Sequence, residues 1–374
     1  MIYLDNAATT IPDIQVVEEI QRVLMDCYAN PSALYSEGMK SASLLEKARE
    51  QLAVELGCSA KEVYFTASGT EANNMAVLGT ARVRKHFGNE IITTGFEHPS
   101  VLNAVDALRK EGFRVHTVKP DSGGTVDPLR ILELVNERTV LVAVMHINNE
   151  TGSVTDVPAL AGKVKQINRR TAFHSDMIQS FMKYPVSLMK TEIDTASVSA
   201  HKIHGPKGIG ALYVRRGLNI EPVVYGGNQE RGLRSGTENV AYASAFALAA
   251  LRFDTNANLH KAAVLNDSLR EALKGIDGVI VNSPDDASKY ILNFSVLNYR
   301  SETVIHLLDG RGIMISAGAA CSKGSASHTL TAMGLDRRTV ESSLRVSFSK
   351  DNTIKEVDAL IQAVRSVKDS IISY

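Results

Sequence analysis

A lysine that directly follows a short apolar segment is the first residue whose position could support chemistry. Thr195–Ser199 is predicted to be a strand, and His201 and Lys202 come just after it. A lysine at the carboxyl end of a buried strand can serve as a Schiff-base amine when burial and neighbours lower its pKa. Ser199, His201 and Lys202 could also surround a phosphate ester. A lysine in a loop is otherwise usually solvated, so the choice between these two interpretations of Lys202 depends on other residues of the sequence.

An acid and an imidazole stand at two similar positions. Asp176 follows the predicted strand Ala172–Ser175. A buried carboxylate needs a cationic partner, which could be a pyridinium nitrogen or an ordinary Arg or Lys. His98 precedes Pro99, which suits the first position of a helix and makes His98 its predicted cap. There it could stack on a cofactor ring and move protons, or be a structural hydrogen-bonding group.

A turn between a strand and a helix is the candidate phosphate site. Thr66 to Glu71 follows the predicted strand Val63–Thr66, and Ser68 and Glu71 have the spacing of a capping box. Free backbone N–H groups at such a helix start favour a phosphate. A plain helix cap is the more common outcome for this pattern alone.

A cysteine among small residues is the candidate reactive thiol. Cys321 lies in the segment from Ser316 to Ser325, and Lys323 would favour its thiolate. The alternative is a small buried hydrophobic residue, which fits Cys27 and Cys58 better. Arg345, in the predicted strand Leu344–Phe348, could clamp a carboxylate through two hydrogen bonds or form a structural ion pair.

Alternating strands and helices must position these residues. Seven strands are predicted before about residue 251, which favours an α/β fold with a mainly parallel sheet covered on both faces. Ligand sites in such sheets gather at the carboxyl ends of the strands. The strands are predicted at Val63–Thr66, Ile91–Thr94, Arg114–Val118, Val140–His146, Ala172–Ser175, Thr195–Ser199 and Ile209–Val214. The helices between and after them are predicted at Met39–Leu56, Glu71–Lys85, Ser100–Arg109, Pro128–Glu137, Val157–Arg169 and Val240–Leu251.

A smaller α+β unit is predicted after residue 251. Its strands are expected at Val279–Val281, Ile291–Val296 and Leu344–Phe348, and its helices at Asn256–Lys274, Glu302–Leu308 and Thr353–Ser370.

Composition narrows the class of protein. The 374 residues carry 41 basic and 41 acidic side chains, and this balance argues against a binder of nucleic acid. The N-terminus lacks a secretory signal pattern, and the longest apolar stretch, Val240 to Leu251, is too short to span a bilayer. The three cysteines form no CxxC pair, so a disulfide framework or a metal site is not expected. We therefore predict a cytoplasmic protein without membrane attachment.

The order of the motifs resembles a known family. The motifs are Tyr3-Leu4-Asp5-Asn6-Ala7-Ala8-Thr9-Thr10, Asn30-Pro31-Ser32, Thr70-Glu71-Ala72-Asn73-Asn74, Glu97-His98, Asn148-Asn149-Glu150-Thr151-Gly152, Asp176-x-x-Gln179, His201-Lys202, Arg234-Ser235-Gly236-Thr237 and the segment around Cys321. Over essentially the whole chain, this arrangement resembles the cysteine desulfurases of the NifS/IscS type, in the class V aminotransferase superfamily.

The resemblance implies a fold-type-I pyridoxal 5'-phosphate enzyme that works as a homodimer. It implies a large domain at residues 13–251 and a small domain made of residues 1–12 and 252–374. Lys202 resembles the lysine that binds the cofactor covalently, His98 the proton carrier stacked on the ring, and Cys321 the thiol that becomes a persulfide. The resemblance assigns cofactor contacts to Gly69, Thr70, His98, Asn149, Asp176, Gln179, Ser199, His201 and Lys202, and to Thr237 from the other subunit. It assigns substrate contacts to Asn30, Asn149 and Arg345.

The expected reaction converts L-cysteine to L-alanine and passes sulfur through Cys321 to an acceptor, in iron–sulfur cluster assembly or tRNA thiolation. A selenocysteine lyase or another class V aminotransferase is an alternative, and a non-catalytic sulfur carrier or assembly protein is a second. Three departures from the family pattern stand out. Tyr35 lies where a His is frequent, Met177 follows Asp176, and the segment after Cys321 is shorter than usual. The shorter segment bears on which acceptor Cys321 can reach.

Overall fold

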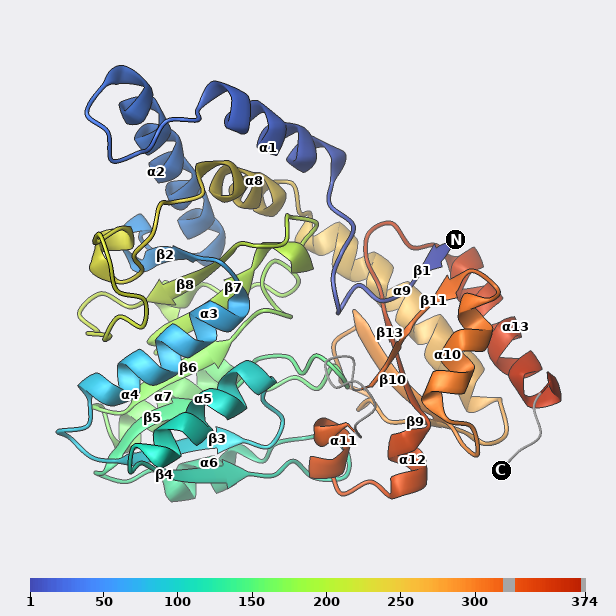
Figure 1. Cartoon of the computed structure of the whole chain (residues 1–374). Coiled ribbons are helices and arrows are strands. Elements are labelled where there is room, and N and C mark those ends of the chain that lie inside the picture. The colour runs from blue at the N-terminus through green and yellow to red at the C-terminus, as the bar shows by residue number, and fades with distance from the viewer. Residues whose placement is uncertain (319–326, 371–374) are drawn as a thin grey trace.

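A seven-stranded sheet forms the centre of the larger part of the molecule (Figure 1), in a computed structural model that describes residues 1–318 and 327–370. Its strand order is β2-β8-β7-β6-β5-β3-β4, and only β8 runs antiparallel to its neighbours. The predicted mainly parallel sheet is therefore confirmed. The strands are β2 (Val63–Thr66), β3 (Glu90–Thr94), β4 (Arg114–Val118), β5 (Thr139–Ala143), β6 (Ala172–Asp176), β7 (Thr195–Ser199) and β8 (Gly210–Val214).

Helices cover both faces of this sheet, which explains why nearly every residue of its strands is buried except in the edge strand β4. Successive residues of β3 show the alternation: Ile91 packs with α5 and Ala81, whereas Ile92 belongs to the cluster that contains α2, α7 and α8. The helices are α1 (Ile14–Asp26), α2 (Ser36–Leu56), α3 (Gly69–Asn74), α4 (Thr80–Val83), α5 (Pro99–Lys110), α6 (Pro128–Leu134), α7 (Val157–Ile167) and α8 (Val240–Leu251). Short helical turns lie at η1 (Ala60–Glu62), η2 (Met75–Gly79), η3 (Leu188–Lys190), η4 (Ala200–Lys202) and η5 (Glu230–Gly232).

A second hydrophobic core lies in the C-terminal third of the chain. It is built on an antiparallel sheet of order β12-β13-β10-β9 and on the parallel pair β1-β11. The strands are β1 (Ile2–Tyr3), β9 (Val279–Val281), β10 (Ile291–Val296), β11 (Ile313–Met314), β12 (Ser316–Ala317) and β13 (Ser343–Ser347). The helices are α9 (Thr255–Lys274), α10 (Ser301–Asp309), α11 (His328–Ala332), α12 (Arg337–Glu341) and α13 (Ile354–Ser370).

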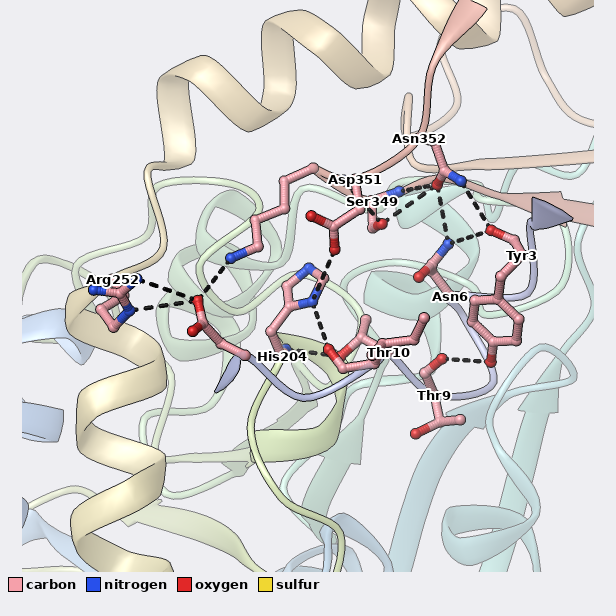
Figure 2. A network of polar contacts seen from close by, with 12 residues as sticks. Tyr3, Asn6, Thr9, Thr10, His204, Arg252, Ser349, Asp351 and Asn352 are labelled. Carbon is pink, nitrogen blue, oxygen red and sulfur yellow. Dashed lines mark hydrogen bonds and ion pairs between the residues drawn. The ribbon is translucent and has the colours of Figure 1, made fainter. Parts of the chain in front are cut away.

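The first ten residues connect the two parts of the molecule. Figure 2 shows that Asn352 donates to the Tyr3 carbonyl at 2.8 Å and that the His204 amide donates to Thr10 Oγ1 at 2.7 Å. Asn6 Nδ2 also donates to Asn352 Oδ1, at 3.2 Å. Residues 2 to 6 are thus held by the C-terminal third, while Thr10 is held by the loop that follows Lys202.

Several elements differ from the sequence predictions. The helix α1 was not predicted; it buries Val16 and Val23 and leaves Ile14, Leu24 and Met25 exposed. In β13 every residue is buried, because β10 and β12 pair with the strand on its two edges and the N-terminal segment and the loop containing Asn149 pack against it. The predicted Val140–His146 strand ends three residues earlier, at Ala143.

Within residues 1–318 and 327–370, no helix is long and apolar enough to cross a membrane.

Candidate active site

A cavity of about 370 Å³ lies beside the carboxyl ends of β6 and β7. It brings together ten of the predicted site residues from segments distant in sequence: Gly69, Thr70, His98, Asn149, Asp176, Gln179, Ser199, His201, Lys202 and Arg345. Parallel strands end at the same edge of the sheet, which is why these motifs converge. A larger cavity of about 840 Å³, beside Arg300 and Arg337, contains none of the predicted residues.

Lys202 occupies the turn that follows β7. Its ammonium donates to the Ala7 carbonyl at 2.6 Å and to the Ala8 carbonyl at 2.8 Å. The strand ends at Ser199 and the chain makes one short helical turn, η4, which brings Lys202 over the strand ends. The N-terminal segment therefore determines where this amine lies.

Asp176 is the last residue of β6 and is only 3% exposed. Its Oδ2 accepts from Asn73 Nδ2 at 2.8 Å, and its Oδ1 accepts from the Ile178 amide at 3.0 Å. No described Lys or Arg forms an ion pair with it, so the structural salt bridge considered from the sequence is absent among the described residues. The carboxylate is held rigidly and retains the ability to stabilise a cation in the cavity.

His98 is the N-cap of α5 with Pro99 at the first helical position, as predicted. Its Nδ1 accepts from the Ser100 amide at 3.1 Å and lies 2.7 Å from Ser100 Oγ. Because Nδ1 accepts the amide hydrogen bond, a neutral ring must carry its proton on Nε2. Burial lowers the pKa of His98, which favours this neutral form.

The turn before α3 confirms the predicted cap and forms one wall of the cavity. Ser68 Oγ accepts from the Glu71 amide at 3.1 Å, and the Glu71 carboxylate accepts from the Ala67 amide. A side chain at Gly69 would place its Cβ 2.2 Å from Ile178 Cδ1, so glycine is required for Ile178 to pack there. The predicted phosphate ligand Thr70 follows directly, with its side chain exposed.

Several cations lie close together in this site. Burial, Lys202 and Arg345 lower the pKa of the buried Lys183 to about 7, and its Nζ lies 3.4 Å from Gln179 Oε1. Burial, with Lys202 as the next contributor, lowers the pKa of His201 to about 3. His201 is therefore uncharged near neutral pH, and it is the positive charge of Lys202 and Arg345, with that of Lys183 when protonated, that would favour an anionic ligand.

Arg345 is buried on β13, with 2% of its side chain exposed. Nη1 donates to the Asn149 carbonyl at 2.8 Å, and Nη2 forms an ion pair with Asp5 Oδ1 at 2.8 Å. Its Nε is buried and has no hydrogen-bond partner among the described residues. An unsatisfied guanidinium N–H beside a cavity is suited to a ligand carboxylate.

Two predicted site residues lie away from this cavity, and one lies outside the described residues. Asn30 and Thr237 are both exposed and line a separate cavity of about 400 Å³ beside α1. Cys321, with Lys323, belongs to the undescribed range 319–326. Of the departures noted in the sequence, Tyr35 caps α2 from an exposed position, whereas Met177 is buried in the main core.

The structure also identifies cavity and supporting residues that the sequence analysis did not assign. Ala7, Ala8 and Met145 line the cavity. Glu97 is fully buried, and burial raises its pKa to about 8. Burial also raises the pKa of Glu150, whose neighbour Asn149 lines the cavity. Glu150 belongs to the motif from Asn148 to Gly152, but the spacing of this motif did not indicate a function for its carboxylate.

These residues fit an anionic aromatic cofactor such as pyridoxal phosphate. The amine of Lys202, the carboxylate of Asp176, the imidazole of His98 and the guanidinium of Arg345 all line one cavity. Among the described residues, no cluster of His, Cys, Asp and Glu could hold a metal ion.

Comparisons with known proteins point to one family. The family model described as "Aminotransferase class-V" matches residues 2–360. "Putative cysteine desulfurase IscS 1" of Bacillus subtilis (strain 168) is 36% identical over 375 residues, covering 98% of each chain. "Cysteine desulfurase" of Nostoc sp. is 37% identical, covering 99% of this chain and 94% of that protein. A solved "NIFS-LIKE PROTEIN" superimposes with a TM-score of 0.93 at 37% identity, covering 99% of this chain and all of that one. The NifS-like protein from Rickettsia africae gives 0.89 at 32% identity, with 99% coverage of both.

Proposed function

Because the chain belongs to the class V aminotransferase family, whose members generally depend on pyridoxal phosphate, and is a cysteine desulfurase, we propose that its Lys202 cavity converts L-cysteine to L-alanine and passes the sulfur to Cys321. The observation that carries this proposal is the convergence of Lys202, Asp176, His98 and Arg345 on one cavity. These four side chains supply an amine, an acid partner, a proton carrier and a carboxylate ligand.

The protein residues divide the chemistry between them. Pyridoxal phosphate, when bound, supplies an electron sink for the substrate carbon. We assign Asp176 to its ring nitrogen, Gln179 to its phenolic oxygen, and Gly69, Thr70, Ser199 and His201 to its phosphate, with His98 stacked on the ring. Asn149 borders both cofactor and substrate.

Substrate orientation and proton transfer follow from the geometry. Arg345 binds the cysteine carboxylate, and its unpaired Nε offers a donor that no described residue uses. Lys202 removes the Cα proton when its amine is neutral and returns a proton afterwards, as a general base and then a general acid. The Ala7 and Ala8 carbonyls hold its ammonium form between these steps.

Sulfur transfer requires a thiolate as nucleophile, a role that we assign to Cys321. Its S–S bond forms as the Cβ–S bond of cysteine breaks, and Cβ keeps the bonding pair and is then protonated to give alanine. An external thiol or an acceptor protein subsequently takes the outer sulfur from the persulfide. We propose an iron–sulfur scaffold or a tRNA-thiolation protein as acceptor, and the cytoplasm as the location.

Product analysis of the purified yellow protein tests this function. With L-cysteine and a reductant, we expect sulfide and alanine in equal amounts, because each C–S cleavage yields one of each. Both products are quantified in the same reaction, with L-alanine in place of cysteine as the control. A keto acid in place of alanine would contradict the proposal and support an aminotransferase.

We also propose that the enzyme is a homodimer with two domains, residues 13–251 and residues 1–12 with 252–374. Exposed apolar side chains gather around α1 and the start of α2: Ile14, Leu24, Met25, Tyr28, Leu34, Tyr35 and Met39. Asn30 and Thr237 line a cavity beside these residues instead of the Lys202 cavity. If the partner covers this surface, Thr237 can contact the partner's cofactor phosphate and Asn30 can approach the partner's substrate.

Mixed dimers test this assignment. We expect Thr237→Ala homodimers to bind pyridoxal phosphate roughly tenfold more weakly, because a hydrogen bond to a charged group contributes about 1.5–3 kcal/mol. Mixing them with Lys202→Ala subunits should restore one tight site per heterodimer, since the Lys202→Ala subunit donates an intact Thr237. Cofactor titration measures the affinity, and light scattering should give twice 40.5 kDa.

The matched control mixes Thr237→Ala subunits with subunits carrying both Thr237→Ala and Lys202→Ala, which cannot complement. Equal recovery in both mixtures, or a monomeric mass, would rule out the proposed exchange of Thr237 between subunits.

A further inference from the structure

We propose that Glu150 is a positioning residue that fixes the C-terminal flank of the segment carrying Cys321 beside the Lys202 cavity. The inference rests on the proposed role of Cys321 and adds the residue that determines from where this thiol approaches. Its basis is a set of described contacts at Gly318, Ser327 and Thr329, the residues that flank range 319–326.

The C-terminal end of that range is bound through both carboxylate oxygens of Glu150. Ser327 Oγ donates to Oε2 at 2.5 Å, and Thr329 Oγ1 donates to Oε1 at 3.0 Å. Ser327 Oγ also accepts from the Leu330 amide at 3.0 Å and so caps α11. One serine hydroxyl therefore connects the start of a helix to a buried carboxylate, which is 3% exposed.

The N-terminal flank lies near the same carboxylate but is bonded to β13, where the Gly318 amide donates to the Ser343 carbonyl at 3.4 Å. Gly318 follows β12, and a Cβ built on it would lie 3.6 Å from Glu150 Oε2 and 2.7 Å from Ser343 Oγ. The absence of a side chain lets the Gly318 backbone approach both groups closely. Gly318 and Ser327, nine positions apart in the sequence, thus lie around a single oxygen atom.

Glu150 adjoins the cavity wall through its neighbour Asn149. Asn148 Oδ1 accepts from the amides of Glu150 and Thr151, both at 2.9 Å, which fixes this turn. The intervening Asn149 lines the cavity, and its carbonyl accepts from Arg345 Nη1. Asn149, which accepts from Arg345, and Glu150, which accepts from Ser327 and Thr329, are therefore neighbours in one turn.

A carboxylate suits this role better than an amide. Ser327 Oγ accepts from Leu330, so its own hydrogen must be donated, and Glu150 is its acceptor. In Glu150→Gln, an NH₂ facing Ser327 would leave that hydrogen without an acceptor, and the flipped amide would instead face Thr329. The first orientation removes the bond to Ser327, whereas the second keeps it only if the Thr329 hydroxyl changes from donor to acceptor.

Steady-state kinetics of the Glu150→Gln holoenzyme tests the proposal. We expect KM for cysteine to change by less than about twofold and kcat to fall by about 10²-fold, as expected for a small misplacement of reacting groups. The colour change that follows cysteine addition should keep its rate, whereas alanine formation slows. Ser327→Ala should reproduce this split, and the double variant should add little further loss because both changes break one bond.

Thiol labelling separates position from intrinsic reactivity. Alkylation of Cys321 by iodoacetamide, corrected with a Cys321→Ser sample, should stay within about threefold of wild type, because a small free reagent needs no fixed approach. Burial raises the pKa of Cys58 to about 12 and so suppresses its background reaction. In Glu150→Gln, kcat should therefore fall much more than the rate at which iodoacetamide alkylates Cys321.

Asp336→Asn is the matched control. Asp336 Oδ2 accepts from Thr339 Oγ1 at 2.7 Å, a similar carboxylate–threonine bond on the following helix, and Asp336 does not line the cavity. We expect its kcat to stay near wild type. Unchanged kcat in both Glu150→Gln and Ser327→Ala, a rise in KM alone, or an equal loss in Asp336→Asn would overturn the inference. If Cys321→Ser retains full turnover, it is instead the proposed role of Cys321 that fails.

Discussion

Replacement of Lys202 by alanine is expected to abolish desulfuration and the yellow colour of the protein together. The loss in kcat should be at least about 10⁴-fold, because the variant lacks both the covalent amine and the general base for the Cα proton. The Lys202 amine donates to the Ala7 and Ala8 carbonyls. It lies at the strand ends, where the other cavity residues converge. Sulfide release and the visible spectrum, measured on the same sample, provide the test.

Lys207→Ala is the control for that experiment. Lys207 lies five positions further along the same loop, but its side chain is exposed and does not line the cavity. It should keep its colour and its kcat within about twofold, as is usual for a surface substitution. If Lys202→Ala retains measurable turnover while Lys207→Ala loses it, the assignment of the amine is wrong.

Replacement of Cys321 by serine should remove sulfide and alanine formation while leaving the protein yellow. A serine hydroxyl is not ionised near neutral pH and cannot form a persulfide, so we expect a loss of at least about 10³-fold. The retained colour would show that the cofactor site is intact. Sulfide, alanine and protein-bound persulfide should be measured in parallel.

Cys58→Ser serves as the comparison for this variant. Burial raises the pKa of the Cys58 thiol to about 12, so it is almost entirely protonated near neutral pH and is a poor nucleophile. Its replacement should leave kcat unchanged. Alanine formation that continues at the wild-type rate in Cys321→Ser would mean that C–S cleavage proceeds without this thiol, as in a lyase.

The sheet and most of the cavity could be predicted because their signals are local. The strands β2, β4 and β7 have the predicted boundaries, since each is a short β-branched run that ends in a turn. Asp176 is the last residue of β6, and Lys202 lies in the turn that follows β7. Parallel strands bring their carboxyl ends to one edge, so placement of the strands also placed these residues.

The supporting contacts could not be predicted, because they join segments far apart in the chain. The Ala7 carbonyl accepts from both Lys202 and Gln179. Every residue has a backbone carbonyl, so the residue type does not indicate which ones accept such bonds. Glu150 meets Ser327 and Thr329 only after the two cores have packed together. The ion pair of Arg345 with Asp5 likewise depends on the position of the N-terminal segment, which no local pattern specifies.

The attachment of residues 2 to 8 has a consequence for biosynthesis. The ribosome makes this segment first, yet Tyr3 pairs with Met314 and Asp5 with Arg345, which are made near the end. Closing such long intervals is slow compared with forming local helices. The carbonyls that hold Lys202 are therefore positioned only after β13 has been synthesised. A polypeptide released before that point would lack the contacts that fix the N-terminal segment, and with them the two carbonyls that accept from Lys202.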